Sequence, residues 1–240
     1  MNYQEHAAHP DLALFVECYW TGETEPERDQ ETGKRVLPDG CIDLLWTSGQ
    51  PPSLSLVGPM SVAEEFATDV PASFFGVRFR PGGAAALLGI HSRDYRDAVV
   101  PFELGTGKGS QSALNRLEAF LLARRELADT DSDGFIRFFS ALYNDFEGGY
   151  SRSGYSDRHL RRLFDRWVGL SWVSFRRIAR LQRLVRSDLR HGFAAAAADC
   201  GYYDQPHMNR DVSRLAGISP TQLAADHMAV FSKQLESSGR

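Results

Sequence analysis

The feature that most constrains this chain is a sequence pattern that occurs twice in its last third. One copy opens with Gly154-Tyr155-Ser156 and closes with Gly169-Leu170-Ser171, and the other opens with Gly201-Tyr202-Tyr203-Asp204 and closes with Gly217-Ile218-Ser219. In each copy a glycine and an aromatic residue precede a good helix N-cap, and a second glycine ends a helix of about three turns. The repeat predicts two copies of one helical unit.

The helix of the first unit has one apolar face and one cationic face. With Ser156 as the N-cap, its apolar residues fall at positions i, i+3, i+4 and i+7, the spacing of a buried helical stripe. These residues are Leu160, Leu163, Phe164 and Trp167. The arginines on another face are Arg158, Arg161 and Arg162. A capped helix with arginines in its first two turns suits the major groove of DNA, and a solvated surface helix is the alternative.

The helix of the second unit has the same plan with different polar residues. Asp204 is the predicted N-cap, and Pro206 falls in the first turn, where the missing amide costs nothing. The buried stripe is Met208, Val212 and Leu215, and the outward-facing residues are Gln205, His207, Asn209 and Arg210. Glutamine and asparagine bond adenine bidentately and arginine bonds guanine, so this face suits base recognition.

The net charge of −4 conceals an uneven distribution. Residues 1–150 hold 12 basic and 23 acidic side chains, whereas residues 151–220 hold 13 arginines and 6 aspartates. A basic segment that follows an acidic one indicates that the C-terminal part meets a polyanion, and arginine favours bidentate contacts to phosphate or guanine. An arginine-rich helical face in solvent is the competing interpretation.

The N-terminal part has strand patterns separated by turns and then helical patterns. After the strong turn at Pro38-Asp39-Gly40, short alternating runs predict strands at 41–46, 53–57 and 73–79. Helical spacing follows at 84–88, 114–127, 134–146, Phe175–Leu189 and Phe193–Cys200. Phe175–Leu189 is expected to be a rigid connector with arginines outside its apolar side.

These patterns predict an α+β chain. Its N-terminal sensor domain is expected to be β-rich, cupin-like or a small barrel, and its all-α domain to hold two helix-turn-helix units joined by a linker helix. The predicted boundaries are 1–130 for the N-terminal sensing or dimerisation domain, 133–225 for the DNA-binding domain and 226–240 for a C-terminal tail.

Residues from about 133 to 225 resemble the AraC/XylS family of transcription regulators, whose DNA-binding domain has two helix-turn-helix units on a linker helix. The strongest match is Gly201–Val212, continued by Gly217-Ile218-Ser219-Pro220. The N-terminal part is similar to an AraC subgroup in three motifs: Leu37-Pro38-Asp39-Gly40-Cys41, Val57-Gly58-Pro59 and Phe79-Arg80-Pro81-Gly82-Gly83-Ala84. The two resemblances cover nearly the whole chain.

The resemblance implies a transcription regulator that binds double-stranded promoter DNA and works with RNA polymerase. It carries the base-reading positions over to Arg158, Arg161, Arg162, Gln205, His207, Asn209 and Arg210. It also implies modulation by a small-molecule effector or by homodimerisation through the N-terminal domain. No cofactor, metal or catalytic residue is expected.

Two departures from the family pattern concern the first unit. Gly148 and Gly149 fall in its expected supporting helix, where each glycine costs about 1 kcal/mol relative to alanine. Trp172 stands where Ser-Pro is usual, whereas Pro220 keeps that pattern in the second unit. We therefore expect the first supporting helix to be short or loose and to become ordered on DNA.

The candidate effector-binding residues lie near two of the predicted strands. They are Asp39, Cys41, Asp43, Trp46, Arg78 and Arg80. The first four are expected to alternate along one strand and line a sensor pocket; the other interpretation buries Trp46 in the core and has Asp39 cap its own turn. Arg80-Pro81-Gly82-Gly83 suits either an anion site at a helix start or a plain strand-to-helix turn.

The alternative class is a metal-dependent cupin-like enzyme with an appended nucleic-acid-binding domain. Its potential ligands would be His6, His9, Cys18, Asp39, Cys41 and Asp43, which follow no known ligand spacing. The chain has no HExxH, GxSxG, P-loop or dinucleotide motif, and its three cysteines are too dispersed for a thiolate zinc site or a disulfide framework. We expect no catalysis.

Membrane insertion and export are not expected. No stretch approaches the roughly 18 apolar residues that a membrane span needs, and Met1–Phe15 lacks the pattern of a signal peptide. The predicted location is the cytoplasm, with the protein on the nucleoid when bound to DNA.

Overall fold

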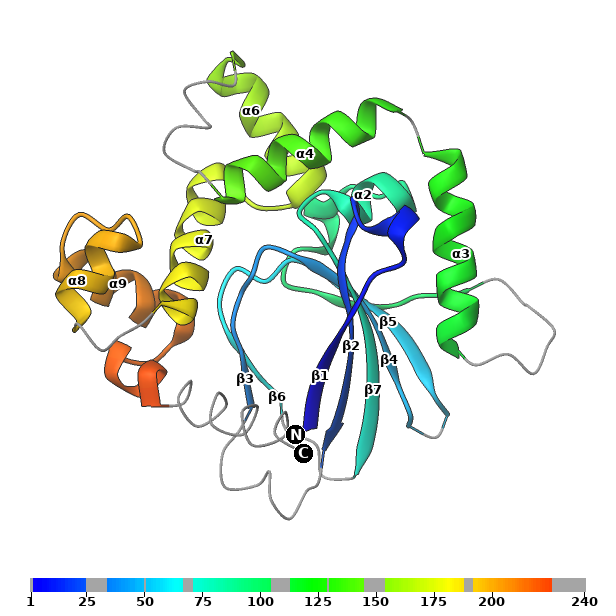
Figure 1. Ribbon diagram of the computed structural model, residues 1–240, viewed down its shortest axis with the longest axis horizontal. Helices are drawn as coiled ribbons and strands as arrows, with labels where there is room; N and C mark the ends of the chain where they lie inside the picture. The colour runs from blue at the N-terminus through cyan, green and yellow to red at the C-terminus, as the bar shows by residue number, and fades with distance from the viewer. Residues whose placement is uncertain are drawn as a thin grey trace.

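The computed structural model describes residues 2–24, 34–49, 51–66, 71–104, 113–128, 130–144, 154–187 and 192–225, and the structural statements below concern these residues. Figure 1 shows the strands of the first half of the chain at the centre of the molecule and the helices of the last third to one side. The predicted fold class, a β-rich domain followed by a helical one, is confirmed.

The N-terminal domain is built on a six-stranded antiparallel sheet. In sheet order its strands are β1 (Asn2–Ala7), β2 (Val16–Thr24), β7 (Ala72–Phe79), β4 (Ile42–Thr47), β5 (Ser53–Val57) and β8 (Val99–Pro101). A separate antiparallel pair consists of β3 (Lys34–Val36) and β6 (Glu64–Phe66). The predicted strands at 41–46, 53–57 and 73–79 are β4, β5 and β7, because alternating polarity marks a strand with one buried face.

One face of the sheet carries the core of the N-terminal domain. Leu44 and Val77, which pair across β4 and β7, point to this face and are almost fully buried. The elements that cover it are the 3-10 helix η1 (Pro10–Leu12), α2 (Gly83–Leu88) and α3 (Ala113–Leu127). A left-handed Gly89 ends α2, as its sequence predicts.

Helix α4 (Thr130–Asn144) belongs to two hydrophobic cores. Its Ile136 packs in the N-terminal core, whereas Phe139 and Leu142 pack in the core of the C-terminal helices. The helix begins before the predicted start at residue 134 because its first turn is polar and gives no apolar period. The predicted domain boundary near residue 130 stays a prediction.

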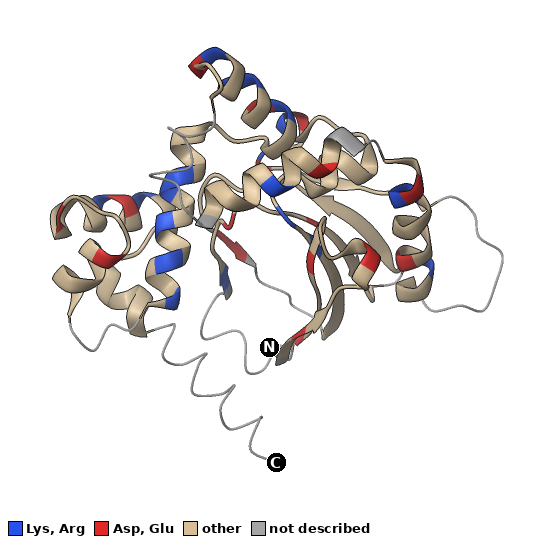
Figure 2. Cartoon of the chain, turned by 45° about the horizontal axis from the view of Figure 1, so that its top comes forward, with Lys and Arg blue, Asp and Glu red and all other residues tan. Residues whose placement is uncertain are grey.

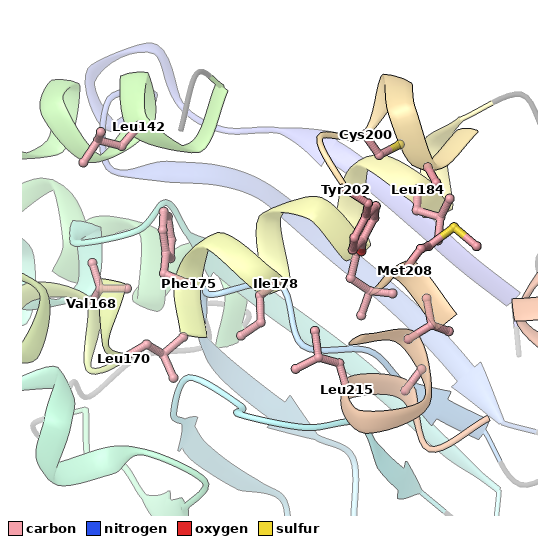
Figure 3. Close-up of a cluster of buried hydrophobic side chains, with 14 of the residues drawn as sticks. Leu142, Val168, Leu170, Phe175, Ile178, Leu184, Cys200, Tyr202, Met208 and Leu215 are labelled. Carbon is pink, nitrogen blue, oxygen red and sulfur yellow. The ribbon is translucent and has the colours of Figure 1, made fainter. Parts of the chain in front are cut away.

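The C-terminal helices pack around one central helix. They are α6 (Asp157–Leu163), the π turn η3 (Phe164–Val168), α7 (Trp172–Arg186), α8 (Phe193–Asp199) and α9 (Gln205–Ala216), and residues 220–225 are helical as well. Figure 3 shows Phe175 and Ile178 of α7 in the same cluster as Met208 and Leu215 of α9. Burial of these apolar side chains holds the helices together.

The predicted three-turn helix of the first unit is α6 followed by the π turn. The N–H of Gly169 donates to the carbonyl of Phe164 at 2.8 Å, a bond that spans five residues. The wider turn shifts the helical phase by one residue, so Val168 is buried and Trp167 is only partly buried. Gly148, Gly149 and the rest of the predicted supporting helix lie outside the described residues.

The connecting helix differs from its prediction in position and in burial. It runs over Trp172–Arg186, with Ser171 as its N-cap, instead of Phe175–Leu189, and Leu189 lies outside the described residues. Arg180, which was expected outside the apolar side, is buried. Periodicity alone missed this because α7 contacts neighbours on more than one side.

Candidate nucleic-acid interface

The start of α6 is open to solvent and cationic. The Ser156 hydroxyl accepts a hydrogen bond from the backbone N–H of His159 at 3.3 Å, which confirms the predicted N-cap. All three predicted arginines are exposed: Arg158, Arg161 and Arg162. Leu160 and Leu163 are buried on the other side of the helix. The cap fixes where the helix starts, and the buried stripe turns the arginines outward.

The start of α9 repeats this construction. The Asp204 carboxylate accepts a hydrogen bond from the backbone N–H of His207 at 2.7 Å, and Pro206 lies in the first turn, as predicted. Three of the predicted base-reading residues are exposed: Gln205, Asn209 and Arg210. Met208 and Val212 are fully buried beneath them.

His207 is the predicted reading residue that is engaged within the protein. Its Nδ1 accepts a hydrogen bond from the N–H of Tyr203 at 3.3 Å, and its Nε2 lies 3.5 Å from Oδ2 of Asp211. Since Nδ1 is an acceptor, a neutral ring carries its proton on Nε2, facing that carboxylate. The ring therefore supports the first turn of α9, and its role in base reading stays a prediction.

Charged and aromatic side chains connect α7 with α9 and with the turn before α9. Asp211 is 5% exposed, and its Oδ1 lies 3.5 Å from Nε of Arg177. The Arg180 guanidinium lies 5.8 Å from the centre of the Tyr202 ring, and burial raises the pKa of that phenol. Part of the arginine excess of this segment thus stabilises the helix pair.

Two exposed aromatic residues beside the caps were not among the predicted site residues. Tyr155 and Tyr203 each directly precede the N-cap of α6 or α9, and they are 43% and 92% exposed. The repeat itself contained the signal, because the aromatic residues occupy equivalent positions in the two units. Figure 2 shows further basic segments on α6 and along α7.

Only some of the predicted effector residues lie around Arg78. On the sheet face opposite the core, Nε of Arg78 lies 3.3 Å from Oδ2 of Asp39 and 3.6 Å from Oδ1 of Asp43. Its Nη1 lies 3.6 Å from Oε1 of Glu5 and donates to the Tyr3 hydroxyl at 3.5 Å. One guanidinium thus joins three carboxylates from β1, β4 and the turn before β4. We call these residues, together with Cys41 beside Asp39, the Arg78 cluster.

Burial changes the acidity of two groups in this cluster. It raises the pKa of Asp43 to about 6, although Arg78 lowers it, and Oδ2 of Asp43 accepts a hydrogen bond from Nε1 of Trp20 at 3.1 Å. Burial also raises the pKa of the Cys41 thiol well above its ordinary value. The N–H of Cys41 donates to Oδ1 of Asp39 at 2.8 Å, so Asp39 does cap its own turn.

Trp46 and Arg80 lie away from the Arg78 cluster. Trp46 packs against the core side of β4, and Asp43 lies on the other side because three residues along a strand reverse the face. The expected alternation from Asp39 to Trp46 is therefore wrong at Trp46. That residue instead lines a hollow of about 190 Å³ beside α3. Nε of Arg80 donates to the carbonyl of Ala13 at 3.0 Å.

Within the described ranges, no helix is long and apolar enough to cross a membrane. In the same part of the chain, no group of three or more His, Cys, Asp or Glu side chains is arranged to hold a metal ion. Cys18, Cys41 and Cys200 are buried free thiols.

Two families match separate parts of the chain. Residues 4–101 match a family described as a domain of unknown function (DUF6597), and residues 151–226 match one described as a helix-turn-helix domain. The chain carries a helix-turn-helix domain. That domain includes α6 and α9, so both capped helices belong to it, and it supports DNA binding and transcription regulation as the class of function.

The chain is also similar to solved structures of ToxT from Vibrio cholerae. One of them, at 1.65 Å resolution, has 7% sequence identity and a TM-score of 0.43, over 92% of this chain and 97% of that chain. Another, bound to (E)-4-(8-methylnaphthalen-1-yl)but-3-enoic acid, has the same identity and TM-score over 92% and 98%. A search of curated proteins found no match.

Proposed function

We propose that this chain is a sequence-specific transcription regulator of the AraC type that binds double-stranded promoter DNA. The observation that carries the proposal is the pair of capped helices, α6 and α9, which expose polar and cationic side chains from their first turns within a helix-turn-helix domain. Such helix starts approach base edges in the major groove. The AraC/XylS resemblance covers the same segment.

The proposed DNA contacts differ in chemistry between the two units. The first unit offers arginines, which suit guanine or phosphate, and the second adds amides that suit adenine. The proposed contact residues are Arg158, Arg161, Arg162, Gln205, His207, Asn209 and Arg210. Because the two sets differ, the site on DNA should be asymmetric.

The remaining parts of the proposal concern the N-terminal part and the partners. We propose a sensing or dimerisation domain over residues 1–130, a DNA-binding domain over 133–225 and a tail over 226–240. A small-molecule effector would meet the Arg78 cluster, and RNA polymerase and a second copy of the chain are the proposed protein partners. A promoter-binding protein works where the DNA is, which favours the cytoplasm.

The test of the proposal uses the full chain. DNA that it binds is selected from a pool of random duplexes, and the affinity for the selected DNA is then measured at several salt concentrations. We expect one enriched motif and an affinity that falls steeply with salt, with a slope of about 0.9 for each phosphate neutralised. The double variant Arg161→Ala/Arg162→Ala should lose this binding. Its control, Arg116→Ala, removes an exposed arginine of α3, outside residues 133–225, and should keep it. Selection without an enriched motif would refute the proposal.

A further inference from the structure

The N-terminal domain contacts the C-terminal end of the first proposed reading helix. The Ser92 hydroxyl donates to the carbonyl of Trp167 at 2.7 Å, and Nε of Arg96 donates to the carbonyl of Gly169 at 2.6 Å. Ser92 is fully buried and opens the 3-10 helix η2 (Ser92–Tyr95). A second arginine, Arg93, has its Nη1 3.1 Å from Oδ2 of Asp165 in the π turn. The end of the first helix is therefore bound to η2.

The same domain contacts the C-terminal end of α9. Nη1 of Arg35 donates to the carbonyl of Ala216 at 2.8 Å, and the N–H of Ala63 donates to the carbonyl of Leu215 at 2.7 Å. Arg35 also pairs with Glu65, which lies opposite it in the β3–β6 ladder. The end of α9 is thus bound to the β3–β6 pair and the residue before β6, just as the end of the first helix is bound to η2.

The two contacts match in their chemistry. Each reading helix ends at a glycine in the left-handed conformation, Gly169 with φ 79° and Gly217 with φ 70°. At the end of α9 a guanidinium donates to the last helical carbonyl, and at the end of the first helix one donates to the carbonyl of the capping glycine, both where the helix dipole is negative. A side chain at Gly169 would place its Cβ 2.6 Å from the carbonyl oxygen of Ser92, so this approach is close.

We propose that the N-terminal domain sets the spacing and relative rotation of the two reading surfaces on DNA, with Arg35 and Arg96 as positioning residues. The contacts lie at the ends of the helices, whereas the proposed reading side chains begin in their first turns. The domain therefore holds both helices and leaves Arg158, Gln205 and their neighbours exposed. This inference rests on the proposed function.

Arg96 binds the short segment Gly169–Ser171, where a change in the backbone would reorient the first unit. These residues connect the π turn to α7, so a hydrogen bond to the Gly169 carbonyl restricts how the first unit turns against the connecting helix. Arg35 holds the second unit instead, through its hydrogen bond at the end of α9. Loss of either guanidinium weakens the hold on one unit and leaves the contacts of the other unit intact, so each variant tests the inference separately.

The test uses full-length protein and the motif that selection delivers, in a series of duplexes with base pairs inserted or deleted between its two elements. Two base pairs rotate one element by about 70° around the helix axis, since B-DNA has about 10–10.5 base pairs per turn. The wild type should lose about tenfold or more in affinity at this step, whereas Arg35→Ala and Arg96→Ala should lose less than about threefold. The matched control is Arg124→Ala, because Nε of Arg124 donates to the end of α2, at the Leu87 carbonyl, within the N-terminal domain. It should keep the wild-type spacing preference.

A duplex with a single element shows whether Arg35 and Arg96 act by positioning the two units, by keeping the protein folded or by contacting DNA themselves. Wild type, Arg35→Ala and Arg96→Ala should bind it within about twofold of one another, because the reading side chains are intact. If both variants keep the wild-type spacing preference, or if they weaken single-element binding as much as two-element binding, the inference is wrong. A wild type that enriches a motif but tolerates every spacing also refutes it. Failure to enrich any motif would instead refute the proposed function.

Discussion

The arginines of the C-terminal helices differ in what their side chains contact. Arg161 and Arg162 are exposed on α6, whereas Arg177 lies beside buried Asp211 and Arg180 beside the Tyr202 ring. Arginine suits both settings because its planar group pairs with carboxylates, stacks on aromatic rings and bonds guanine. Composition therefore predicts an arginine-rich surface, but only the fold separates the arginines available to DNA from those that join helices.

Arg161 is the first residue to test on DNA. We expect Arg161→Ala to cost about 1–3 kcal/mol of binding free energy on the selected motif, concentrated at one base pair, because a base-reading arginine loses its bidentate contact. Competition binding against single-base-pair variants of the motif measures this loss. A phosphate-contacting arginine would instead weaken all sequences alike and lower the salt slope by about one. Arg158→Ala and Arg162→Ala are the comparison, and equal loss on cognate and scrambled DNA for all three would remove base reading from the first unit.

Asp43 should make the stability of the protein depend on pH. Its pKa is raised from 3.8 to about 6, chiefly by burial, so the folded state holds a proton that the unfolded state releases between these values. This stabilisation is fully present below about pH 4 and is lost as the pH rises through about 6. Relative to Asp43→Asn, the free energy of unfolding of the wild type should fall by about 2–3 kcal/mol between pH 4 and pH 7.

Chemical denaturation of both proteins across this pH range gives the difference. Asparagine keeps an oxygen acceptor for Trp20 and does not titrate, so groups far from Asp43 cancel in the comparison and the difference reports Asp43 with the charges that face it. A difference that stays constant from pH 4 to pH 7 would contradict the shifted pKa.

At the scale of elements, local signals predict starts and ends well and predict burial less well. Ser156 and Asp204 begin helices, and the left-handed Gly217 ends one, where the sequence indicates, because capping depends on residues within one turn. Periodicity did not predict the π turn after Leu163 or the start of α4, because the π turn departs from the 3.6-residue period and the first turn of α4 is polar. Trp46 is a different case, because strict alternation along β4 already places it, three residues after Asp43, on the opposite face.

The two N-caps give an element-scale prediction. Asp204→Ala should lower the free energy of unfolding by about 1 kcal/mol, within a usual range of about 0.5–2, because the N–H of His207 loses its acceptor. Asp204→Asn is the matched control and should lose only a few tenths, since its side-chain oxygen still accepts. Urea denaturation measures both. An alanine variant as stable as the asparagine variant would show that the hydrogen bond at 2.7 Å does not stabilise α9.

At the scale of the whole molecule, the two domains are joined by shared packing and by contacts between residues far apart in the sequence. Helix α4 supplies Ile136 to one core and Phe139 to the other, and Gly40 approaches the Phe175 ring. Sequence reasoning predicted the two domains from changes in pattern and charge. It did not predict their junction, because no local signal pairs the turn at Pro38 with a residue of α7.

Gln182 of α7 tests whether this junction stabilises the whole chain. Its side chain is buried, and Nε2 donates to the carbonyl of Pro38 at 2.8 Å. Gln182→Leu should lower the free energy of unfolding by about 1–3 kcal/mol, because it leaves a buried carbonyl without a donor. The exposed residue Gln4 provides the control, and Gln4→Leu should change stability by less than about 0.5 kcal/mol.

Since α4 belongs to both cores, wild type and both variants should unfold in one transition followed by circular dichroism and by tryptophan fluorescence. Two separate transitions in the wild type would mean that the domains unfold independently. A Gln182→Leu variant as stable as the control would mean that the contact with Pro38 does not stabilise the junction.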